Sequence, residues 1–97
     1  HREMMLRYSQ RAQSDLESII LYLNGRSPSG ARHVYDRLMG AFNGLLEMPF
    51  AGMETDISGV RVLFVGRYPY KIFYRVSGSF IDILHIRHTS RRPTQFG

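Results

Sequence analysis

The chain has 97 residues, 43% of them apolar and 22% charged, with a formal net charge of +5 and no cysteine. This composition is that of one folded domain with a modest core, and it excludes a disordered chain, a disulfide framework and thiolate chemistry. No apolar stretch approaches the roughly 20 residues that cross a bilayer, and we expect a cytoplasmic protein. We also expect one domain over residues 1–97, in which 1–3 are a cloning remnant and 94–97 a disordered tail.

Met4 to Tyr8 alternate between apolar and polar residues, which favours a short first strand. Ser9 follows and is expected to cap a helix, since its hydroxyl can accept a hydrogen bond from an amide of the first turn. Apolar residues then recur with helical spacing, at Ala12, Leu16, Ile19, Ile20 and Leu23. This pattern predicts a helix with one buried face, away from Asp15. Gly25 should end the helix in the left-handed conformation.

A second helix is expected after a short link. Ser27 and Pro28 provide a cap and a first helical residue with a preset φ. The apolar positions again have helical spacing: Ala31, Val34, Tyr35, Leu38, Phe42, Leu45 and Leu46. Gly40 and Gly44 lie inside this helix at a cost of about 1 kcal/mol each relative to alanine, so we expect a neighbour to pack closely against them. Pro49 ends the helix, and the two helices form a hairpin.

The rest of the chain predicts a polar loop over 50–59 and three strands over about 60–65, 70–76 and 80–87. Gly66 to Pro69 and Ser77 to Ser79 separate these strands with residues typical of turns. The predicted order is β-α-α-β-β-β. We therefore expect an α+β fold in which a small, mostly antiparallel twisted sheet is covered on one face by the helical hairpin.

The positive charge is concentrated at the C-terminal end of the chain. Residues 1–60 contain six Lys and Arg against seven Asp and Glu, whereas residues 61–97 contain seven Lys and Arg against Asp82 alone. This asymmetry favours an acidic partner, either nucleic acid or an acidic protein segment, over a merely solvated basic surface.

Strand alternation divides these charges between the two faces of the sheet. In the second of the three strands, Lys71, Phe73 and Arg75 share one face, and the other face carries Tyr70, Ile72, Tyr74 and Val76. In the strand before it, Arg61 shares a face with Leu63 and Val65. Since the helices cover only one face, the other should present cations among aromatic rings, a surface suited to an anionic partner. For Lys71 and Arg75 the alternative stays equally open that they only lie along apolar neighbours with their charges in water.

His85 and His88 lie close to these cations in the sequence. A histidine beside a scissile phosphate can act as a general acid, with arginines stabilising the developing charge. Residues three apart in a strand point to opposite faces, so this pair should form no metal site, and no metal or other cofactor is expected. A structural or surface role is the more common one for a histidine. Glu54 and Asp56 could supply a base, although acidic side chains in loops are usually only solvated.

Four segments together resemble toxins of the RelE/ParE superfamily, and most closely its ParE branch. They are SQRAQSDLESIILYL, SGARHVYDRLMGAFNGLLEMPFAG, GVRVLFVGRYPYKIFYRV and ILHIRHTSRRP, and the resemblance extends from about Met5 to Pro93. Its most specific parts are G-V-R-x-L-x-V-x-x-Y-P-Y-x-I-F-Y-R-V and I-x-H-x-x-R-x-P. The resemblance implies the toxin of a type II toxin–antitoxin module, of the kind associated with plasmid stabilisation.

The ParE branch implies a growth inhibitor that acts on DNA gyrase by binding and is not itself an enzyme. A cognate antitoxin, expected to be ParD-like with a ribbon-helix-helix domain, would neutralise it in a toxin–antitoxin hetero-oligomer away from any membrane. We expect target contacts at Arg67, Tyr68, Tyr70, Arg87, His88, Arg91 and Arg92. We expect antitoxin contacts at Leu16, Ile20, Arg61, Lys71, Phe73 and Arg75.

Two alternatives stay open. Related RelE-type members are ribosome-dependent mRNA endonucleases on the same fold, and a fold does not decide a function. In an endoribonuclease, His88 would be the acid, and Arg61 or Arg87 would steady the phosphate. A companion acid or base is not evident, since the tail ends with Phe96 and Gly97 and contains no tyrosine. The other alternative is an inactive module that only binds an antitoxin.

Overall fold

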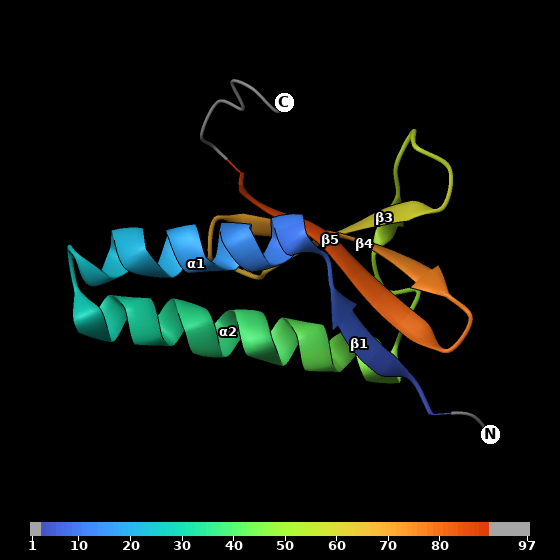
Figure 1. The fold of residues 1–97 in the computed structure, drawn as a ribbon, viewed down its shortest axis with the longest axis horizontal. Coiled ribbons are helices and arrows are strands. Elements are labelled where there is room, and N and C mark those ends of the chain that lie inside the picture. Colours follow the sequence, from blue (N-terminus) through green and yellow to red (C-terminus); the bar gives the residue numbers. More distant parts are fainter. Residues whose placement is uncertain (1–2, 90–97) are drawn as a thin grey trace.

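The computed structural model describes residues 3–89, which form two helices and one five-stranded sheet (Figure 1). In chain order the elements are β1 (Met5–Tyr8), α1 (Gln10–Asn24), α2 (Pro28–Glu47), β2 (Met53–Glu54), β3 (Val60–Phe64), β4 (Tyr70–Ser77) and β5 (Phe80–His88). The strands lie in the order β1-β5-β4-β3-β2, with β1 parallel to β5 and every other neighbouring pair antiparallel. The predicted α+β fold with a helical hairpin is confirmed.

The four longer strands begin and end within one residue of their predicted bounds. The segment over 50–59, predicted as a loop, contains the two-residue strand β2, which pairs with Arg61 and Val62. A strand this short has no periodicity of its own, so only the edge of β3 beside it decides its conformation. The expected tail at 94–97, and most of the expected remnant at 1–3, lie outside the described residues. In the described part of the chain, neither helix is long and apolar enough to span a membrane.

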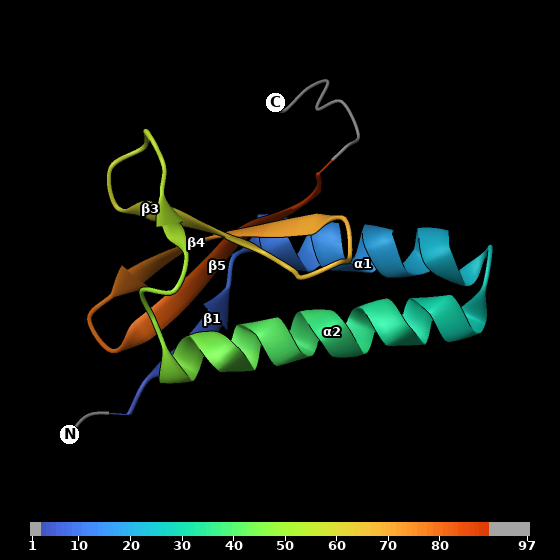
Figure 2. The same ribbon diagram turned by 180° about the vertical axis from the view of Figure 1, so that it is seen from behind.

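Both helices cover the same face of the sheet, and the turn that joins them projects beyond it (Figures 1 and 2). The side chains buried between helices and sheet are Ala12, Val34, Leu38, Phe42, Leu45, Val65, Tyr70, Ile72, Tyr74, Ile81, Ile83 and Ile86. Tyr70, Ile72 and Tyr74 of β4 are at most 4% exposed. This is the inner face of the sheet, and we call the opposite face, with Lys71 and Arg75, the open face.

The helices begin at the predicted caps. The hydroxyl oxygens of Ser9 and Ser27 each accept a hydrogen bond from an amide of the first turn, at 2.9 and 3.1 Å. The end of α1 differs from the prediction, because Gly25 has φ −68° and is right-handed. The amides of Gly25 and of the two residues after it donate to the carbonyls of Leu21 and Leu23. These bonds satisfy the last carbonyls of α1 without a left-handed residue.

Gly40 and Gly44 lie on the exposed side of α2. A Cβ atom at either position would meet no heavy atom within 4 Å among residues 3–89. The expectation of a closely packed neighbour is therefore wrong for the described part of the chain. The two glycines lower the stability of α2 without any packing in return.

An irregularity in β5 decides which of its residues face the helices. Phe73 pairs with His85 while Tyr74 pairs with Ile83, so Leu84 is an extra residue in β5. Such a bulge inverts the alternation of side chains along the strand. Beyond Leu84, the even-numbered residues of β5 therefore point to the inner face and the odd-numbered residues to the open face.

Candidate functional site

The open face carries cations and aromatic rings from three strands. The register places Phe64 of β3 opposite Lys71 of β4, and Lys71 opposite Arg87 of β5. The Lys71 Nζ atom lies 5.8 Å from the ring centroids of both Phe64 and Phe73, and Arg87 Cζ lies 6.0 Å from that of Phe73. These are cation–π distances. We call these four residues the Lys71 cluster, in which Phe64 is the member that the sequence analysis missed.

Arg75 lies on the same face, beside an ion pair. Arg7 of β1 donates to both carboxylate oxygens of Asp82, at 2.7 and 3.2 Å. The hydrogen bond to Asp82 raises the pKa of the Arg7 guanidinium above its usual value. Arg75 is opposite Asp82 in the β4–β5 register. The single acidic residue of the C-terminal part thus reduces the positive charge at this end of the open face and not at the Lys71 cluster.

His85 ties β5 to α1. Its Nδ1 atom lies 2.6 Å from Asp15 Oδ2, and the same oxygen accepts a hydrogen bond from the Ile86 N–H at 3.0 Å. The His85 ring also stacks on Phe73, with centroids 5.7 Å apart. Asp15 thus accepts a main-chain hydrogen bond from β5 beyond the point where β1 ends. Because the same carboxylate holds the His85 ring, His85 has a structural role. The helical pattern placed Asp15 away from the buried face, but its side chain is only 18% exposed.

The predicted target contacts do not gather at one place. Arg87 is on the open face, whereas the His88 ring lies at the inner face, edge-on to Tyr70 at 5.3 Å. Tyr70 is 4% exposed and belongs to the core, which opposes a direct contact with a target. Arg67 and Tyr68 lie in the turn between β3 and β4, where Arg67 is exposed and Tyr68 is half-buried. The predicted contacts Arg91 and Arg92 lie outside the described residues.

Arg61 is separated from the Lys71 cluster, because its side chain is on the inner face. Its Nη1 donates to the Gly52 carbonyl at 2.8 Å, and its Nη2 lies 3.5 Å from Glu54 Oε2. The guanidinium carbon lies 4.9 Å from the centroid of the Phe50 ring. Arg61 therefore fastens the connection between α2 and β3. This position argues against the grouping of Arg61 with Lys71, Phe73 and Arg75, which the sequence analysis made for the antitoxin surface.

A groove of about 460 Å³ lies between the two helices, and we call it the helical groove. It is lined by Tyr8, Gln13, Leu16, Glu17, Ile20, Tyr35 and Met39. Leu16 and Ile20, both predicted antitoxin contacts, thus share one groove. Burial, with a smaller effect of Tyr35, raises the pKa of the Tyr8 hydroxyl. The groove and the Lys71 cluster are on different sides of the molecule, so a partner that covers both must pass around an edge of the sheet.

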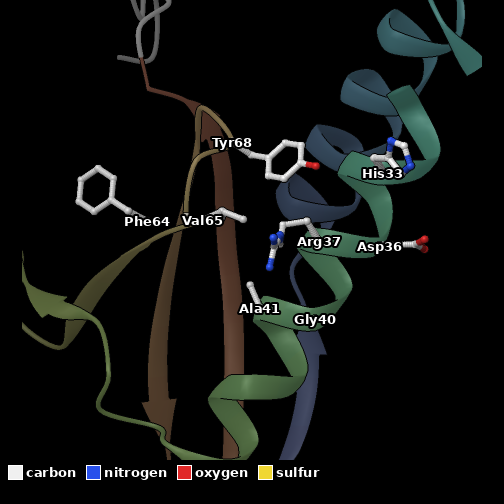
Figure 3. A pocket seen from close by; sticks show the side chains of 9 residues that line it. His33, Asp36, Arg37, Gly40, Ala41, Phe64, Val65 and Tyr68 are labelled. Carbon is white, nitrogen blue, oxygen red and sulfur yellow. The ribbon is translucent and has the colours of Figure 1, made fainter. Parts of the chain in front are cut away.

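A second cavity, of about 550 Å³, lies between α2 and the β3–β4 turn (Figure 3). We call it the hairpin cleft, and its lining residues are His33, Asp36, Arg37, Gly40, Ala41, Phe64, Val65, Gly66 and Tyr68. The side chains of Arg37 and Tyr68 point into it from opposite walls, with Arg37 Cζ 5.6 Å from the Tyr68 ring centroid. The cleft could not be predicted from the sequence, because its walls are about thirty residues apart in the chain.

The groups on these surfaces are suited to binding. The Lys71 cluster can hold an anion and stack on a planar group. The neighbouring His85 already has one ring nitrogen engaged with Asp15. Glu54, a candidate base, is paired with Arg61 on the other side of the sheet. Over residues 3–89, no three His, Asp or Glu side chains gather closely enough to hold a metal ion.

Comparison with known proteins agrees with this fold. A family model described as "ParE toxin of type II toxin-antitoxin system, parDE" matches residues 6–93. The chain is 31% identical over 90 residues to Y4kP of Sinorhizobium fredii, and the match covers 93% of each protein. It is 32% identical over 84 residues to Toxin RelE2 of Caulobacter vibrioides, and this match covers 87% of this chain and 93% of the relative.

Among solved structures, the fold is similar to that in "Chromosomal ParDE TA system from P. aeruginosa". The TM-score is 0.79 and the sequence identity 26%, and the match covers 91% of this chain and 98% of the other. The fold, the spacing of its sequence segments and the family match over nearly the whole chain lead to one assignment. The chain belongs to the ParE toxin family of type II toxin–antitoxin systems.

Proposed function

We propose that this chain is a growth-inhibiting toxin that acts by binding DNA gyrase and is neutralised by a ParD-like antitoxin. The observation that carries the proposal is the Lys71 cluster, which offers cations and rings but no acid–base pair of its own. Losing a general acid or base typically costs 10²–10⁴-fold in rate, so such a surface suits binding better than catalysis. The choice of gyrase rests on the ParE branch alone.

The proposed target surface centres on Lys71 and Arg87 and extends to Arg67 and Tyr68 in the β3–β4 turn. Arg91 and Arg92, which lie outside the described residues, stay predicted target contacts. A supercoiling assay with purified gyrase tests it. Wild-type toxin should inhibit supercoiling at micromolar concentration, and Lys71→Ala should weaken the inhibition. The matched control is Arg26→Ala, which removes an exposed cation that lies over the Tyr22 ring on the helical hairpin.

No inhibition by the wild type would remove gyrase as the target. Equal losses in Lys71→Ala and Arg26→Ala would show that net charge matters and not the Lys71 cluster. Circular dichroism of each variant separates a loss of binding from a loss of folding.

For the antitoxin, we propose a segment that fills the helical groove at Leu16 and Ile20 and continues onto the open face at Lys71, Phe73 and Arg75. The similar P. aeruginosa structure is described as a ParDE system, which supports a ParD-like partner. Co-expression with the product of a short neighbouring reading frame tests this contact. Ile20→Asp should prevent co-purification, whereas Leu21→Asp should not, because Leu21 is 69% exposed and outside the groove. Equal co-purification of both variants would remove the groove from the interface.

The relative named Toxin RelE2 supports a second candidate function, ribosome-dependent cleavage of mRNA. In this case His88 would act as the acid. Arg87 points to the opposite face of the sheet, so of the two arginines predicted to steady the phosphate only Arg61 shares a face with His88. Primer extension on translated messages should then show discrete cuts that are lost in His88→Ala and kept in His33→Ala. If wild-type toxin produces no cuts, the endonuclease is discarded. Normal growth on induction without antitoxin would instead favour an inactive binding module.

A further inference from the structure

The outer edge of β3 is only partly covered by β2. β2 pairs with Arg61 and Val62 alone, and the Thr55 N–H donates to the Val60 carbonyl at 3.1 Å. Main-chain groups along a strand point alternately to its two sides. Val60, Val62 and Phe64 therefore direct their main-chain groups away from β4, toward the outer edge.

The alternation holds at the next residue, where the Val65 N–H donates to the Tyr70 carbonyl at 3.0 Å. If β2 were longer, Ala51 would face Phe64. The Ala51 N–H instead bonds to the Met48 carbonyl at 3.1 Å, because the chain there is still turning out of α2. Within residues 3–89, the main-chain N–H and C=O of Phe64 thus form an open strand edge.

The hairpin cleft begins at this open edge (Figure 3). Phe64, Val65 and Gly66 form one of its walls, and Arg37 and Gly40 of α2 lie on the other. A Cβ atom at Gly40 would meet no heavy atom of the described residues within 4 Å. The space beside the edge is therefore open as far as the surface of α2.

The two sides of the open edge differ in chemistry. On the cleft side, Arg37 forms no ion pair with any residue in 3–89. The neighbouring Asp36 also lines the cleft, but its side chain points away from Tyr68 and Val65 (Figure 3) and forms no ion pair with Arg37. On the open face, the Phe64 residue is 52% exposed. The cleft side thus suits a carboxylate, and the other side suits an apolar side chain.

We propose that an extended segment of a protein partner pairs with β3 at Phe64 as an added strand. Paired strands lie about 4.8 Å apart and consecutive side chains point to opposite faces. Two consecutive residues of one segment can therefore contact both groups, with an acidic side chain against Arg37 and an apolar side chain against Phe64. In this mode the main-chain hydrogen bonds supply affinity and the alternate side chains supply specificity.

A protein segment fits this site better than a nucleic acid. A phosphate could bind Arg37, but the N–H and C=O of Phe64 are spaced to match the main chain of another strand. The inference does not depend on gyrase being the target of the toxin.

The test is a titration of nitrogen-15-labelled toxin, followed by NMR, with the peptide acetyl-SVEVEVEVS-amide. The expected result is a shift of the Phe64 amide and Arg37 side-chain N–H signals, together with slower hydrogen exchange at the Phe64 amide. Arg37→Gln should raise the dissociation constant about tenfold, since a charge-assisted hydrogen bond is lost. The matched control is Arg32→Gln, an exposed arginine of α2 outside the cleft, which should change nothing.

Two altered peptides separate the two parts of the inference. N-methylation of the central residues removes main-chain donors, and replacement of glutamate by lysine reverses the charge. Each change should weaken binding by about tenfold or more. Because the peptide is altered and not the toxin, a loss of binding here cannot come from misfolding.

Several results would overturn the inference. Equal binding of the lysine peptide excludes the Arg37 contact, and equal binding of the N-methylated peptide excludes strand pairing. Shifts confined to the helical groove, or no shift at millimolar peptide, exclude the site. The same shifts with a ten-residue oligothymidylate would assign the cleft to nucleic acid. None of these readouts involves gyrase, so failure of the gyrase proposal is a separate result.

Discussion

The two faces of β4 use neighbouring residues for opposite purposes. On the inner face, Ile72 and Tyr74 are 0% exposed and pack under the helices. On the open face, Lys71 and Arg75 carry charge, and Lys71 lies over the rings of two strands. Interiors are packed densely enough that the loss of a few atoms is felt, whereas an exposed side chain usually contributes little to stability. One face of the strand therefore maintains the fold and the other is available to a partner.

Truncating one residue on each face of β4 tests this difference most directly. Ile72→Ala should lower the free energy of unfolding by about 2–5 kcal/mol, because it leaves a cavity in the core. Lys71→Ala should change it by only about 0.5 kcal/mol, since its side chain is on the surface. Urea unfolding of both variants measures the difference. Similar losses would mean that the open face is packed and is not a free surface.

The next largest effect concerns a single oxygen on the inner face. The Tyr74 hydroxyl donates to the Pro49 carbonyl and accepts from the Gly52 N–H, both at 2.8 Å. Tyr74→Phe keeps the ring but leaves the Gly52 N–H buried without this acceptor. We expect a loss of about 1–3 kcal/mol in the free energy of unfolding. Tyr35→Phe, at a 42% exposed tyrosine, should stay near wild type. Equal stability of all three proteins would contradict the role of this hydroxyl.

Local signals explain what could be predicted from the sequence. Ser9 and Ser27 cap the helices through hydrogen bonds within one turn, so each cap depends on neighbouring residues alone. The turn residues around Gly66 and Gly78 likewise set the ends of the strands, and both glycines have positive φ. The helical hairpin and the order of the longer strands along the chain follow from such signals.

Contacts between distant residues explain what was missed. Alternation grouped Arg61 with Leu63 and Val65, and that grouping belongs to the inner face, where the long side chain reaches the Gly52 carbonyl. The bulge at Leu84 depends on how β5 pairs with β4, and no residue type in the sequence indicates it. The hairpin cleft likewise exists only once α2 lies against the β3–β4 turn. The candidate site is thus less predictable than the fold, because its residues meet only through tertiary packing.

A gain in stability is expected on the side of α2 that has no neighbour. Gly44→Ala should raise the free energy of unfolding by about 0.5–1 kcal/mol, because alanine favours the helix and the new methyl group meets open space. This corresponds to an increase of roughly 2–8 °C in the melting temperature of a domain of this size. Thermal denaturation followed by circular dichroism measures it. A lower melting temperature would show that the exposed side of α2 is packed after all.

The smallest expected effect is on the stability at high pH, because Tyr8 lies in the helical groove in the folded chain and in bulk solvent in the unfolded chain. Burial raises the pKa of Tyr8 in the folded chain above the value of about 10 expected when unfolded. The unfolded chain therefore loses this proton first, and the stability associated with the neutral hydroxyl is lost as the pH rises from about 10 through the folded pKa. Tyr8→Phe keeps the edge-on contact with Phe42, whose ring centroid is 5.3 Å away, but cannot ionise. Urea unfolding between about pH 8 and 10.5 should show a shallower decline in the free energy of unfolding for Tyr8→Phe than for wild type. Parallel declines would mean that solvent reaches the Tyr8 hydroxyl freely in the folded chain.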